Sequence, residues 1–365
     1  MMGFKSSQFQ NTQPSAIDTV LEKNDKWRLA SHIQKAVRQG KVEHARWGAE
    51  QLAFVDQSYL SYRLSVIAVE DVGAGSPDVI LQAMKDGWGK KIIEEKGGKE
   101  FLVQTAVNYA NAVKDRLPCD WISCHHWLAP FEQKYGRWEN LSYQTASQEA
   151  FNPDLSWWER GLFAWSAAGT KRFASGILPV HEGNWEEWKK TCASFSKHED
   201  LEEVMRLGEH QREAHPVFLG LALHERHRRP ESKIEQFKLL NLPDIGPWLS
   251  SAYDKHTSEG TKALRYWLRR HSSSQQWLAS QGLNEDAQLD ALGRLMFWME
   301  GGVCNQEWTH DLTRQLRVDG KRLYLQRNRL EPKAFASFCA QPQSWHEARS
   351  SVIPVQKIKR PTLMV

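Results

Sequence analysis

The segment Tyr59–Asp78 places the strongest constraint on what this chain can fold into. Its residues Leu64, Ile67 and Ala68 follow the i, i+3, i+4 spacing of one helix face, and two neighbouring valines widen that face. A helix with so broad an apolar face is buried on most sides, so we expect other helices to pack around it. The rest of the N-terminal half shows no sustained two-residue alternation, the pattern typical of strands. The sequence therefore predicts a mostly α-helical protein, a multi-helix bundle.

Two carboxylates close this predicted helix. Glu70 and Asp71 lie at its C-terminal end, just before a stretch rich in glycine and proline that stops the helix. Negative charge at a helix C-terminus opposes the helix dipole and typically costs about 0.3–1 kcal/mol. We expect an arginine, with Arg63 as one candidate, or a backbone amide to offset that cost.

The chain of 365 residues is long enough for two helical domains. The predicted order is a flexible arm over residues 1–26, a helical domain over 27–135, a second helical domain with a basic, tryptophan-rich surface over 150–345, and a basic tail over 346–365. At most one short β-hairpin is expected, near residues 316–325, because Asp319 and Gly320 form a plausible hairpin turn.

Residues 29–127 carry a family resemblance. The stretches RLSVIAVEDVGAGSPD (Arg63–Asp78), SHIQKAVRQGKVEHARWGAEQL (Ser31–Leu52) and QTAVNYANAVKD (Gln104–Asp115) resemble the C-terminal helical, collar-type region of clamp-loader-related AAA+ ATPases, the replication-associated recombination protein A group. The resemblance implies a helical domain that self-associates and contacts proteins that handle DNA. The chain contains no GxxxxGK[ST] motif, so the ATPase activity of that family is not expected here.

Charge and cysteine content narrow the class of protein. A net charge of +4 permits nucleic-acid binding without requiring it, because local patches rather than totals select a partner. The five cysteines are odd in number and unevenly spaced, which argues against a disulfide framework and favours the cytoplasm. No run of about 18 apolar residues is present, so no membrane span is expected.

The segment CDWISCHHWLAP (Cys119–Pro130) concentrates cysteine and histidine. Structural zinc sites usually take two pairs of ligands, each pair two to four residues apart. This segment offers one cluster, with four residues between its cysteines, and no second pair. We therefore expect no metal site and no cofactor, and we interpret the segment as the start of a helix with packed histidine and cysteine. Asp120 is the predicted cap of that helix.

Acidic and aromatic residues adjoin one another at two places in a chain with 17 tryptophans. Asp154 precedes Trp157 and Trp158, and Asp120 precedes Trp121. A carboxylate that orients water, next to aromatic walls that hold a displaced base, is the minimum that DNA base excision requires. Helix packing and capping explain the same residues without any chemistry. Both interpretations stay open from the sequence.

The capping interpretation is most specific near the first of these pairs. Ser156 and Glu159 have the spacing of a capping box, which would place the start of a helix there.

Basic residues that could meet DNA phosphates occur in three stretches. One is a glycine-bounded loop, one is the segment HERHRRP (His224–Pro230), and one is a predicted helix over Thr261–His271 with interleaved aromatic residues. The second stretch has an equally good explanation as the solvated end of a helix, favoured by the helix dipole. The basic candidates are Lys171, Arg172, Arg228, Arg229, Arg265, Arg269 and Arg270.

Gly246 belongs to a second, shorter resemblance. The segment LLNLPDIGPWLSSA (Leu239–Ala252) is similar to the hairpin of helix–hairpin–helix DNA glycosylases, in which glycines expose backbone amides to a phosphate. Asp244 stands where that family has its first hairpin glycine. The family also has an acid about twenty residues later, and Tyr266 stands at that position here.

Two functions therefore compete. The first is a DNA-binding protein of repair, replication or defence against foreign DNA, with a cofactor-free DNA glycosylase as the best enzymatic hypothesis. The second is a non-catalytic, collar-like scaffold or replication partner without ATPase activity, self-associating through residues 29–127. A pocket with a carboxylate and two tryptophans beside basic residues would favour the enzyme. A flat apolar face without a pocket would favour the scaffold.

Overall fold

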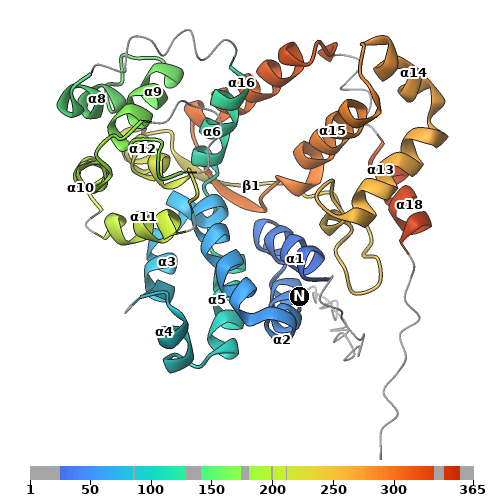
Figure 1. Ribbon diagram of the computed structural model, residues 1–365, viewed down its shortest axis with the longest axis horizontal. Coiled ribbons are helices and arrows are strands. Elements are labelled where there is room, and N and C mark those ends of the chain that lie inside the picture. The colour runs from blue at the N-terminus through green and yellow to red at the C-terminus, as the bar shows by residue number, and fades with distance from the viewer. Residues whose placement is uncertain are drawn as a thin grey trace, which may run out of the picture.

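The computed structural model describes residues 25–84, 87–128, 141–173, 181–198, 200–210, 212–332 and 341–353. These residues are mainly helical and contain one two-stranded sheet, which confirms the predicted mostly α, multi-helix fold (Figure 1). None of the described helices combines the length and the apolar character that crossing a membrane requires.

The helices form three groups in space, with α6 and α16 between them (Figure 1). The first group consists of α1 (Lys26–Arg38), α2 (Val42–Ile67), α3 (Pro77–Met84), α4 (Lys90–Glu95) and α5 (Lys99–Asn111). Helix α6 (Leu117–Trp127) follows it in the chain. The second group is α8 (Tyr143–Ala150), α9 (Trp157–Ala168), α10 (Trp185–Ser196), α11 (Leu201–His210) and α12 (Pro216–Arg228). The third group consists of α13 (Ser258–Arg270), α14 (Ser272–Ser280), α15 (Glu285–Met296) and α18 (Pro342–Val352). Helix α16 (Asp311–Arg327) lies between α15 and α18 in the chain.

The predicted central helix is the second half of α2. At Asp56 the backbone leaves the helical region (φ −161°, ψ 87°), and its Oδ1 accepts a hydrogen bond of 2.9 Å from the Tyr59 amide, as a helix cap does. After this kink, Leu64, Ile67 and Ala68 are fully buried, as expected. The helix then changes into a π turn, η2 (Ala68–Val72), and a 3-10 turn, η3 (Gly73–Gly75).

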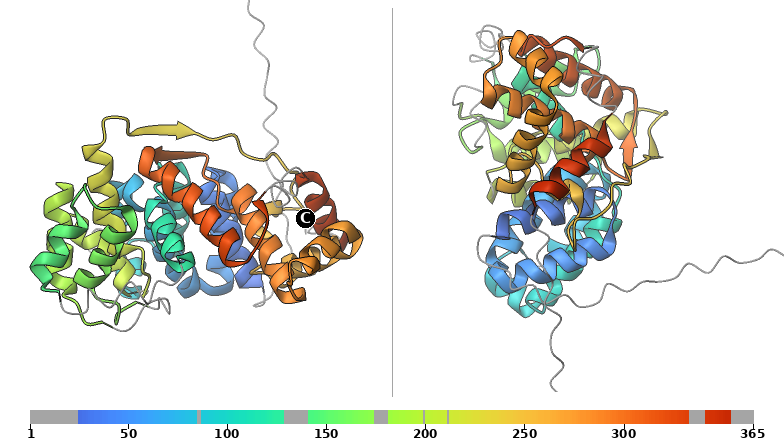
Figure 2. Two further views of the ribbon diagram at one scale, coloured as in Figure 1. Left: turned by 90° about the horizontal axis from the view of Figure 1, so that it is seen from above. Right: turned by 90° about the vertical axis from the view of Figure 1, so that its right-hand side faces the viewer.

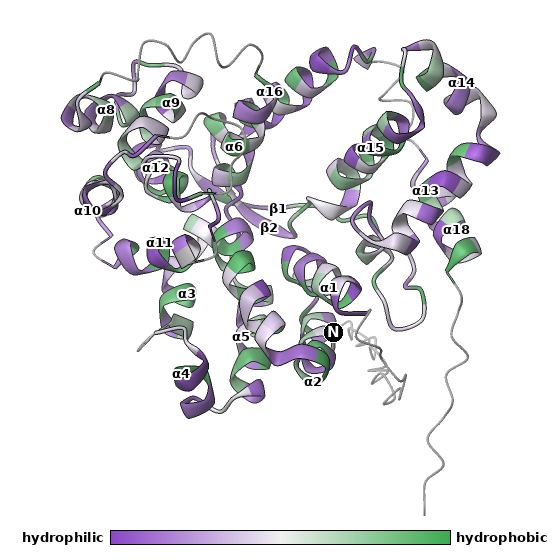
Figure 3. Ribbon diagram, in the orientation of Figure 1, coloured by the Kyte–Doolittle hydropathy of each residue, from purple (hydrophilic) through white to green (hydrophobic). Residues whose placement is uncertain are grey.

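Apolar side chains gather in two cores. The larger core combines α1 to α6 with the second helical group, and the smaller one lies among α13, α14, α15 and α18. Helix α16 contributes to both, through Leu316 and Tyr324 among others. Most helices carry hydrophobic and hydrophilic residues together, as amphipathic helices on a shared core do (Figure 3). Helices on both sides of the expected domain boundary at 135–150 contribute to the larger core. The two cores therefore do not coincide with the two predicted domains.

The predicted β-hairpin at 316–325 is wrong, because these residues lie inside α16. Leu316, Leu323 and Tyr324 are buried there, and the burial of that helix face outweighs the local turn preference of Asp319-Gly320. Gly320 serves close packing instead, since a Cβ at this position would lie 3.3 Å from the Cys124 sulfur on α6.

The strands that do form are remote in sequence. β1 (Lys233–Gln236) pairs antiparallel with β2 (Gln306–Thr309), with Ile234 opposite Trp308. The segment that carries β1 runs along one side of the molecule, from α12 towards the third helical group (Figure 2).

Both ends of the chain extend mostly outside the described residues. Almost all of the predicted arm at 1–26 and residues 354–365 of the predicted tail are not described. Residues 346–352 are not tail, because they belong to α18, where Ala348 and Arg349 are buried.

Close packing of two backbones requires the glycines of η3. A Cβ at Gly75 would lie 2.5 Å from the Lys114 carbonyl carbon and from the Val113 oxygen. We expect Gly75→Ala to lower the free energy of unfolding by about 1–3 kcal/mol, because neither backbone can move without repacking α5 and α6. Equilibrium denaturation in urea measures the change.

Gly89→Ala is the matched control for this substitution. A Cβ at Gly89 meets no atom within 4 Å, and its φ of −118° suits any residue. The control should stay within about 1 kcal/mol of wild type. An equal loss in both variants would contradict the packing account.

Candidate functional site

Two π turns meet at the side chain of Arg38. One is η2, and the other is η5 (Phe297–Gly301) at the end of α15. Arg38 Nε donates to Asp71 Oδ1 at 2.5 Å, its Nη2 to Glu70 Oε1 at 2.7 Å, and its Nη1 to the Gly301 oxygen at 2.8 Å. π turns are frequent at functional sites, and here they join two helical groups through one guanidinium.

An arginine thus offsets the two carboxylates, as the sequence predicts, but the residue is Arg38 and not Arg63. Arg63 Nη2 donates to Gln34 Oε1 at 3.0 Å, and Gln34 in turn donates to a Glu70 oxygen at 2.9 Å. Burial alone would raise the pKa of Glu70, but Arg38 and the other nearby cations hold it well below its ordinary value.

Arg116 extends this charge cluster towards α6. Its Nη1 pairs with Asp71, which is fully buried, and its Nη2 donates to the Cys119 sulfur at 3.0 Å. Burial alone would lower the pKa of Arg116, but Cys119 and the acids around it raise the pKa well above its usual value. The guanidinium therefore stays charged although it is buried.

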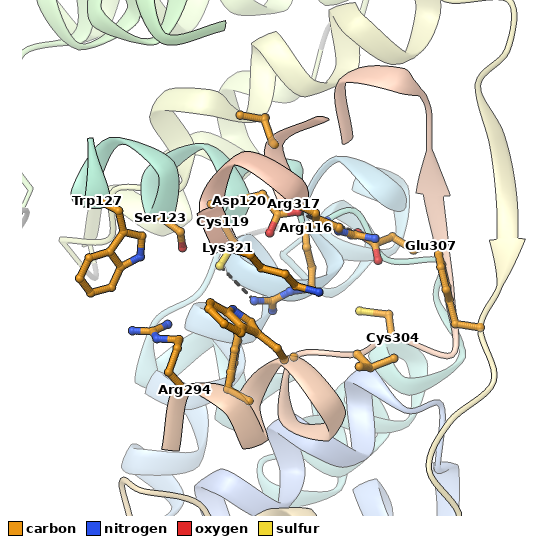
Figure 4. A pocket seen from close by; sticks show the side chains of 17 residues that line it. Arg116, Cys119, Asp120, Ser123, Trp127, Arg294, Cys304, Glu307, Arg317 and Lys321 are labelled. Carbon is orange, nitrogen blue, oxygen red and sulfur yellow. Dashed lines mark hydrogen bonds and ion pairs between the residues drawn. The ribbon is translucent and has the colours of Figure 1, made fainter. Parts of the chain in front are cut away.

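A pocket of about 230 Å³ adjoins the cluster, between α6, α16, η5 and β2 (Figure 4). Its walls combine cations, carboxylates and aromatic rings. The cations are Arg116, Arg294, Arg317 and Lys321, the carboxylates are Asp120 and Glu307, and the aromatic residues are Trp127, Phe237, Phe297 and Trp298.

The two carboxylates of the pocket share one arginine. Arg317 Nε donates to Asp120 Oδ2 at 3.0 Å, and its Nη2 pairs with Glu307. Burial raises the pKa of Glu307 against the opposing pull of Arg317. Asp120 is only partly buried, so it is the carboxylate that a ligand in the pocket reaches more easily.

Two cations of the pocket have no carboxylate partner within the described residues. The Arg294 guanidinium lies 5.3 Å from the ring centre of Trp127, and the Lys321 ammonium lies 5.9 Å from that of Trp298. An uncompensated cation beside an aromatic face suits a ligand that is both anionic and planar.

Of the two predicted acids, the structure places only Asp120 at this pocket. Asp154 is exposed in the turn before α9, and it does not line the pocket. The predicted capping role of Asp120 is wrong, because the N-cap position of α6 is Arg116, and Asp115 just before it accepts a 2.9 Å hydrogen bond from the Leu117 amide through Oδ1. Asp120 lies in the first turn of α6 instead.

The predicted stacking residues pack within the protein. Trp121 is fully buried, its indole N–H donates to the Trp157 oxygen at 2.8 Å, and its ring stacks on Phe218, so it offers no face to a base. Trp157 donates to Asp319 Oδ2 at 3.0 Å, and Trp158 packs against the larger core.

The local interpretations of these two helix starts are confirmed. Ser156 and Glu159 form the capping box of α9. Cys124 and His125 are buried in α6, as packed residues.

Most predicted DNA-contacting cations are already paired. Lys171 pairs with Glu182 and Arg172 with Glu209, each at 2.5 Å, and Arg265 lies 3.4 Å from Glu285. Arg269 and Arg270 on α13 are exposed and form no ion pair in the part of the chain that the structure describes.

Arg228 and Arg229 both bind the buried carboxylate of Glu225. Each donates through Nε to Glu225 at 2.7 Å, and Arg160 Nη2 lies 2.7 Å from the same carboxylate. Burial would raise the pKa of Glu225, but the three arginines lower it to about 2. This stretch is therefore a helix end organised around one internal acid.

Gly246 lies in a tight turn, but the turn is not a helix–hairpin–helix. The Ile245 amide donates to the Trp248 oxygen at 2.8 Å, and Gly246 has a φ of +62°. Residues 237–249 before the 3-10 turn η4 (Ser250–Ala252) form no helix, so the first helix of that motif is missing. Asp244 pairs with His44 at 3.3 Å.

No protein-family model, curated protein or solved structure matches this chain. The collar-type resemblance of residues 29–127 therefore stays a prediction. The interpretation of the site depends on its geometry alone.

Sequence reasoning missed most charged and aromatic residues of the pocket, among them Arg294, Lys321 and Trp298. Trp298 follows the apolar run of α15, and Lys321 lies in the segment that was expected to be a hairpin. Their isolated positions carry no local signal, because α15, α16 and α6 come together only in the folded chain.

Proposed function

We propose that this chain binds DNA and takes a displaced base into the pocket between α6, α16 and η5. The observation that carries the proposal is the position of Arg294 and Lys321 next to the rings of Trp127 and Trp298, since neither cation has a carboxylate partner among the described residues. The rings supply stacking surfaces, worth about 1–3 kcal/mol per base, and the cations suit the adjoining phosphates.

The size of the pocket supports a small planar ligand. About 230 Å³ is below the roughly 300–1,000 Å³ of sites for drug-sized ligands, and it suits a single base better than a larger group.

The enzymatic form of the proposal is N-glycosidic hydrolysis with Asp120 as the carboxylate. Water adds to the sugar carbon, the bond between that carbon and the base nitrogen breaks, and the base leaves with the bonding electrons and a proton. Asp120 orients the water and stabilises the positive charge that develops on the sugar. The contact of Asp120 with Arg317 fixes the position of its carboxylate.

Replacing both Arg294 and Lys321 with alanine tests DNA binding by the pocket. We expect the slope of log affinity against log salt concentration to fall in magnitude by about 1–2, because each cation that meets a phosphate releases counterions. Fluorescence anisotropy with labelled single- and double-stranded DNA, at several salt concentrations, measures both affinity and slope.

Lys90→Ala with Lys91→Ala is the matched control, since both lysines are exposed on α4, away from the pocket. This variant should keep the wild-type slope. A pair of substitutions at Arg269 and Arg270 separates the pocket from the other exposed cations. If only the α13 variant loses salt dependence, DNA binds there and the pocket proposal fails.

A second candidate function is the non-catalytic scaffold, and exposed aromatic residues favour it. Trp27, Phe54 and Tyr62 are 61%, 86% and 38% exposed on α1 and α2, within or beside the collar-like region. Exposed aromatic side chains of this kind suit contact with a second copy of this chain. Sedimentation velocity of the wild type and of Phe54→Ser tests this candidate, which predicts an oligomer that the substitution dissociates. A monomer at every concentration would contradict it.

A further inference from the structure

We propose that Cys119 is a nucleophilic thiolate, activated by His215, which forms a covalent bond to a carbon electrophile that carries a leaving group. This activity goes beyond DNA binding and base excision and does not depend on either. Two observations support the proposal: the sulfur lines two pockets, and charged side chains surround it.

Cys119 lies where a ligand can reach it. It lines the pocket of about 230 Å³ and also a second pocket of about 200 Å³, which continues towards α15 on the other side of Phe297. Among the cysteines that the structure describes, the other three are buried, and Cys119 alone is partly exposed.

Two neighbours of the sulfur, the start of α6 and Arg116, stabilise a thiolate, and a third, the Glu70 carboxylate, opposes it. Cys119 lies in the first turn of α6, where the helix dipole favours negative charge, and Arg116 donates to its sulfur at 3.0 Å (Figure 4). A ring nitrogen of His215, the sulfur and a Glu70 oxygen all lie within 4.8 Å of one another.

His215 is itself oriented by an acid. Its Nδ1 lies 3.5 Å from Glu213 Oε2, so nucleophile, base and orienting group follow one another in space. Burial alone would lower the pKa of His215, but its contacts with Cys119, Glu213 and Glu70 raise it to about 10. A histidine this close to a cysteine can act as the base that takes the thiol proton.

Glu70, Cys119 and His215 are close enough together to hold a metal ion. Two of these three residues, however, already accept hydrogen bonds from other side chains. Glu70 accepts hydrogen bonds from Arg38 and Gln34, and Cys119 accepts from Arg116. A divalent cation would displace these donors and would lie beside buried guanidinium groups, which repel it.

The groups that set the charge at the sulfur come from every element packed around it. They are Arg116 and Asp120 of α6, Glu70 and Asp71 of η2, Arg38 of α1, Arg63 of α2, Arg294 of α15, Arg317 and Lys321 of α16, Cys304 before β2, Glu307 of β2, Asp254, Lys255 and His256 after η4, Glu300 of η5, and Glu213 and His215 before α12. These groups carry charges of both signs, and Arg116 is the one that donates a hydrogen bond to the sulfur.

The covalent step is balanced by groups present in the structure. The Cys119 sulfur forms a bond to the electrophilic carbon, and the bond between that carbon and its leaving group breaks. The leaving group departs with the electron pair and takes the proton that His215 carries. An activated acyl group is the substrate class that this arrangement fits, since the product is then a thioester that water hydrolyses.

Iodoacetamide, which alkylates thiolates and releases iodide, is the probe for the test. The folded protein is treated between pH 5.5 and 9, and mass spectrometry follows the alkylation of each cysteine separately. We expect Cys119 to react first, with a rate that changes less than about threefold between pH 6 and 8. An ordinary thiol, with a pKa near 8.5, changes by roughly 50- to 100-fold over that range.

His215→Gln should return Cys119 to the ordinary pH dependence. His198→Gln is the matched control, because His198 also lies near an acid, 3.5 Å from Asp78, away from Cys119. Where His215→Gln fails to fold, Glu213→Gln keeps the imidazole and should raise the pH of half-maximal reactivity.

Three results would overturn the proposal. The first is an ordinary pH dependence of Cys119 in the wild type. The second is a pH dependence that neither His215→Gln nor Glu213→Gln alters. The third is a stoichiometric metal ion in the purified protein whose removal by a chelator exposes Cys119 to the probe.

Discussion

Replacing Arg38 with methionine is expected to lower the free energy of unfolding by about 3–5 kcal/mol. Arg38 is nearly fully buried and binds Asp71, which is also buried, so the substitution leaves this internal carboxylate with Arg116 as its one remaining arginine partner among the described residues. It also removes the bond to the Gly301 oxygen that holds η5 against α1. Equilibrium unfolding in guanidinium chloride, followed by circular dichroism, measures the loss.

Arg46→Met is the control for this prediction. Arg46 lies 3.8 Å from Glu43 on the exposed side of α2, and exposed pairs contribute about 0–1 kcal/mol. The double substitution Arg38→Met with Asp71→Asn should recover part of the loss, because the neutral amide is cheaper to bury than a carboxylate that has lost one of its two arginine partners. Equal stability of the Arg38→Met and Arg46→Met variants would contradict the assigned role of the cluster.

Asp120→Asn is expected to reduce the rate of base excision by about 10²- to 10⁴-fold, the usual contribution of one positioned carboxylate. The assay uses labelled duplex DNA with normal, damaged and naturally modified bases, and heating in alkali converts abasic sites to strand breaks. The amide keeps the size of the side chain, so binding of DNA should change far less than the rate.

Asp154→Asn provides the comparison, because Asp154 has the same residue type beside tryptophans but lies outside the pocket. It should retain wild-type activity. Loss of activity in Asp154→Asn with full activity in Asp120→Asn would transfer the role to the other acid. Salt-dependent binding with no abasic site on any substrate would leave the scaffold as the better hypothesis.

Local patterns predict the helices of this chain well. The apolar spacing of Leu64, Ile67 and Ala68 marks the buried face of one helix, and Ser156 with Glu159 marks the start of another. Both signals act between neighbours in sequence, where the backbone geometry of a helix fixes which side chains meet.

For contacts between distant segments, the sequence predicts the type of partner but does not identify the residue. The two acids at the end of α2 require a cation, yet the sequence does not identify Arg38, which comes from another helix. The Asp319-Gly320 turn signal fails for the same reason, because packing of α16 on α6 overrides it. The pocket joins α6, α15 and α16, so residue spacing indicates Asp120 as a candidate but not Arg294 or Trp298, which line the same pocket.

Photocrosslinking with DNA that contains 5-iodouracil tests most directly whether the pocket takes a base. The reagent joins to aromatic residues that stack on it, and mass spectrometry then identifies the attached peptide. The account predicts attachment at Trp127 or Trp298, and its loss in the Arg294→Ala, Lys321→Ala variant. Attachment only outside the pocket, for example at Tyr266 on α13, would contradict it.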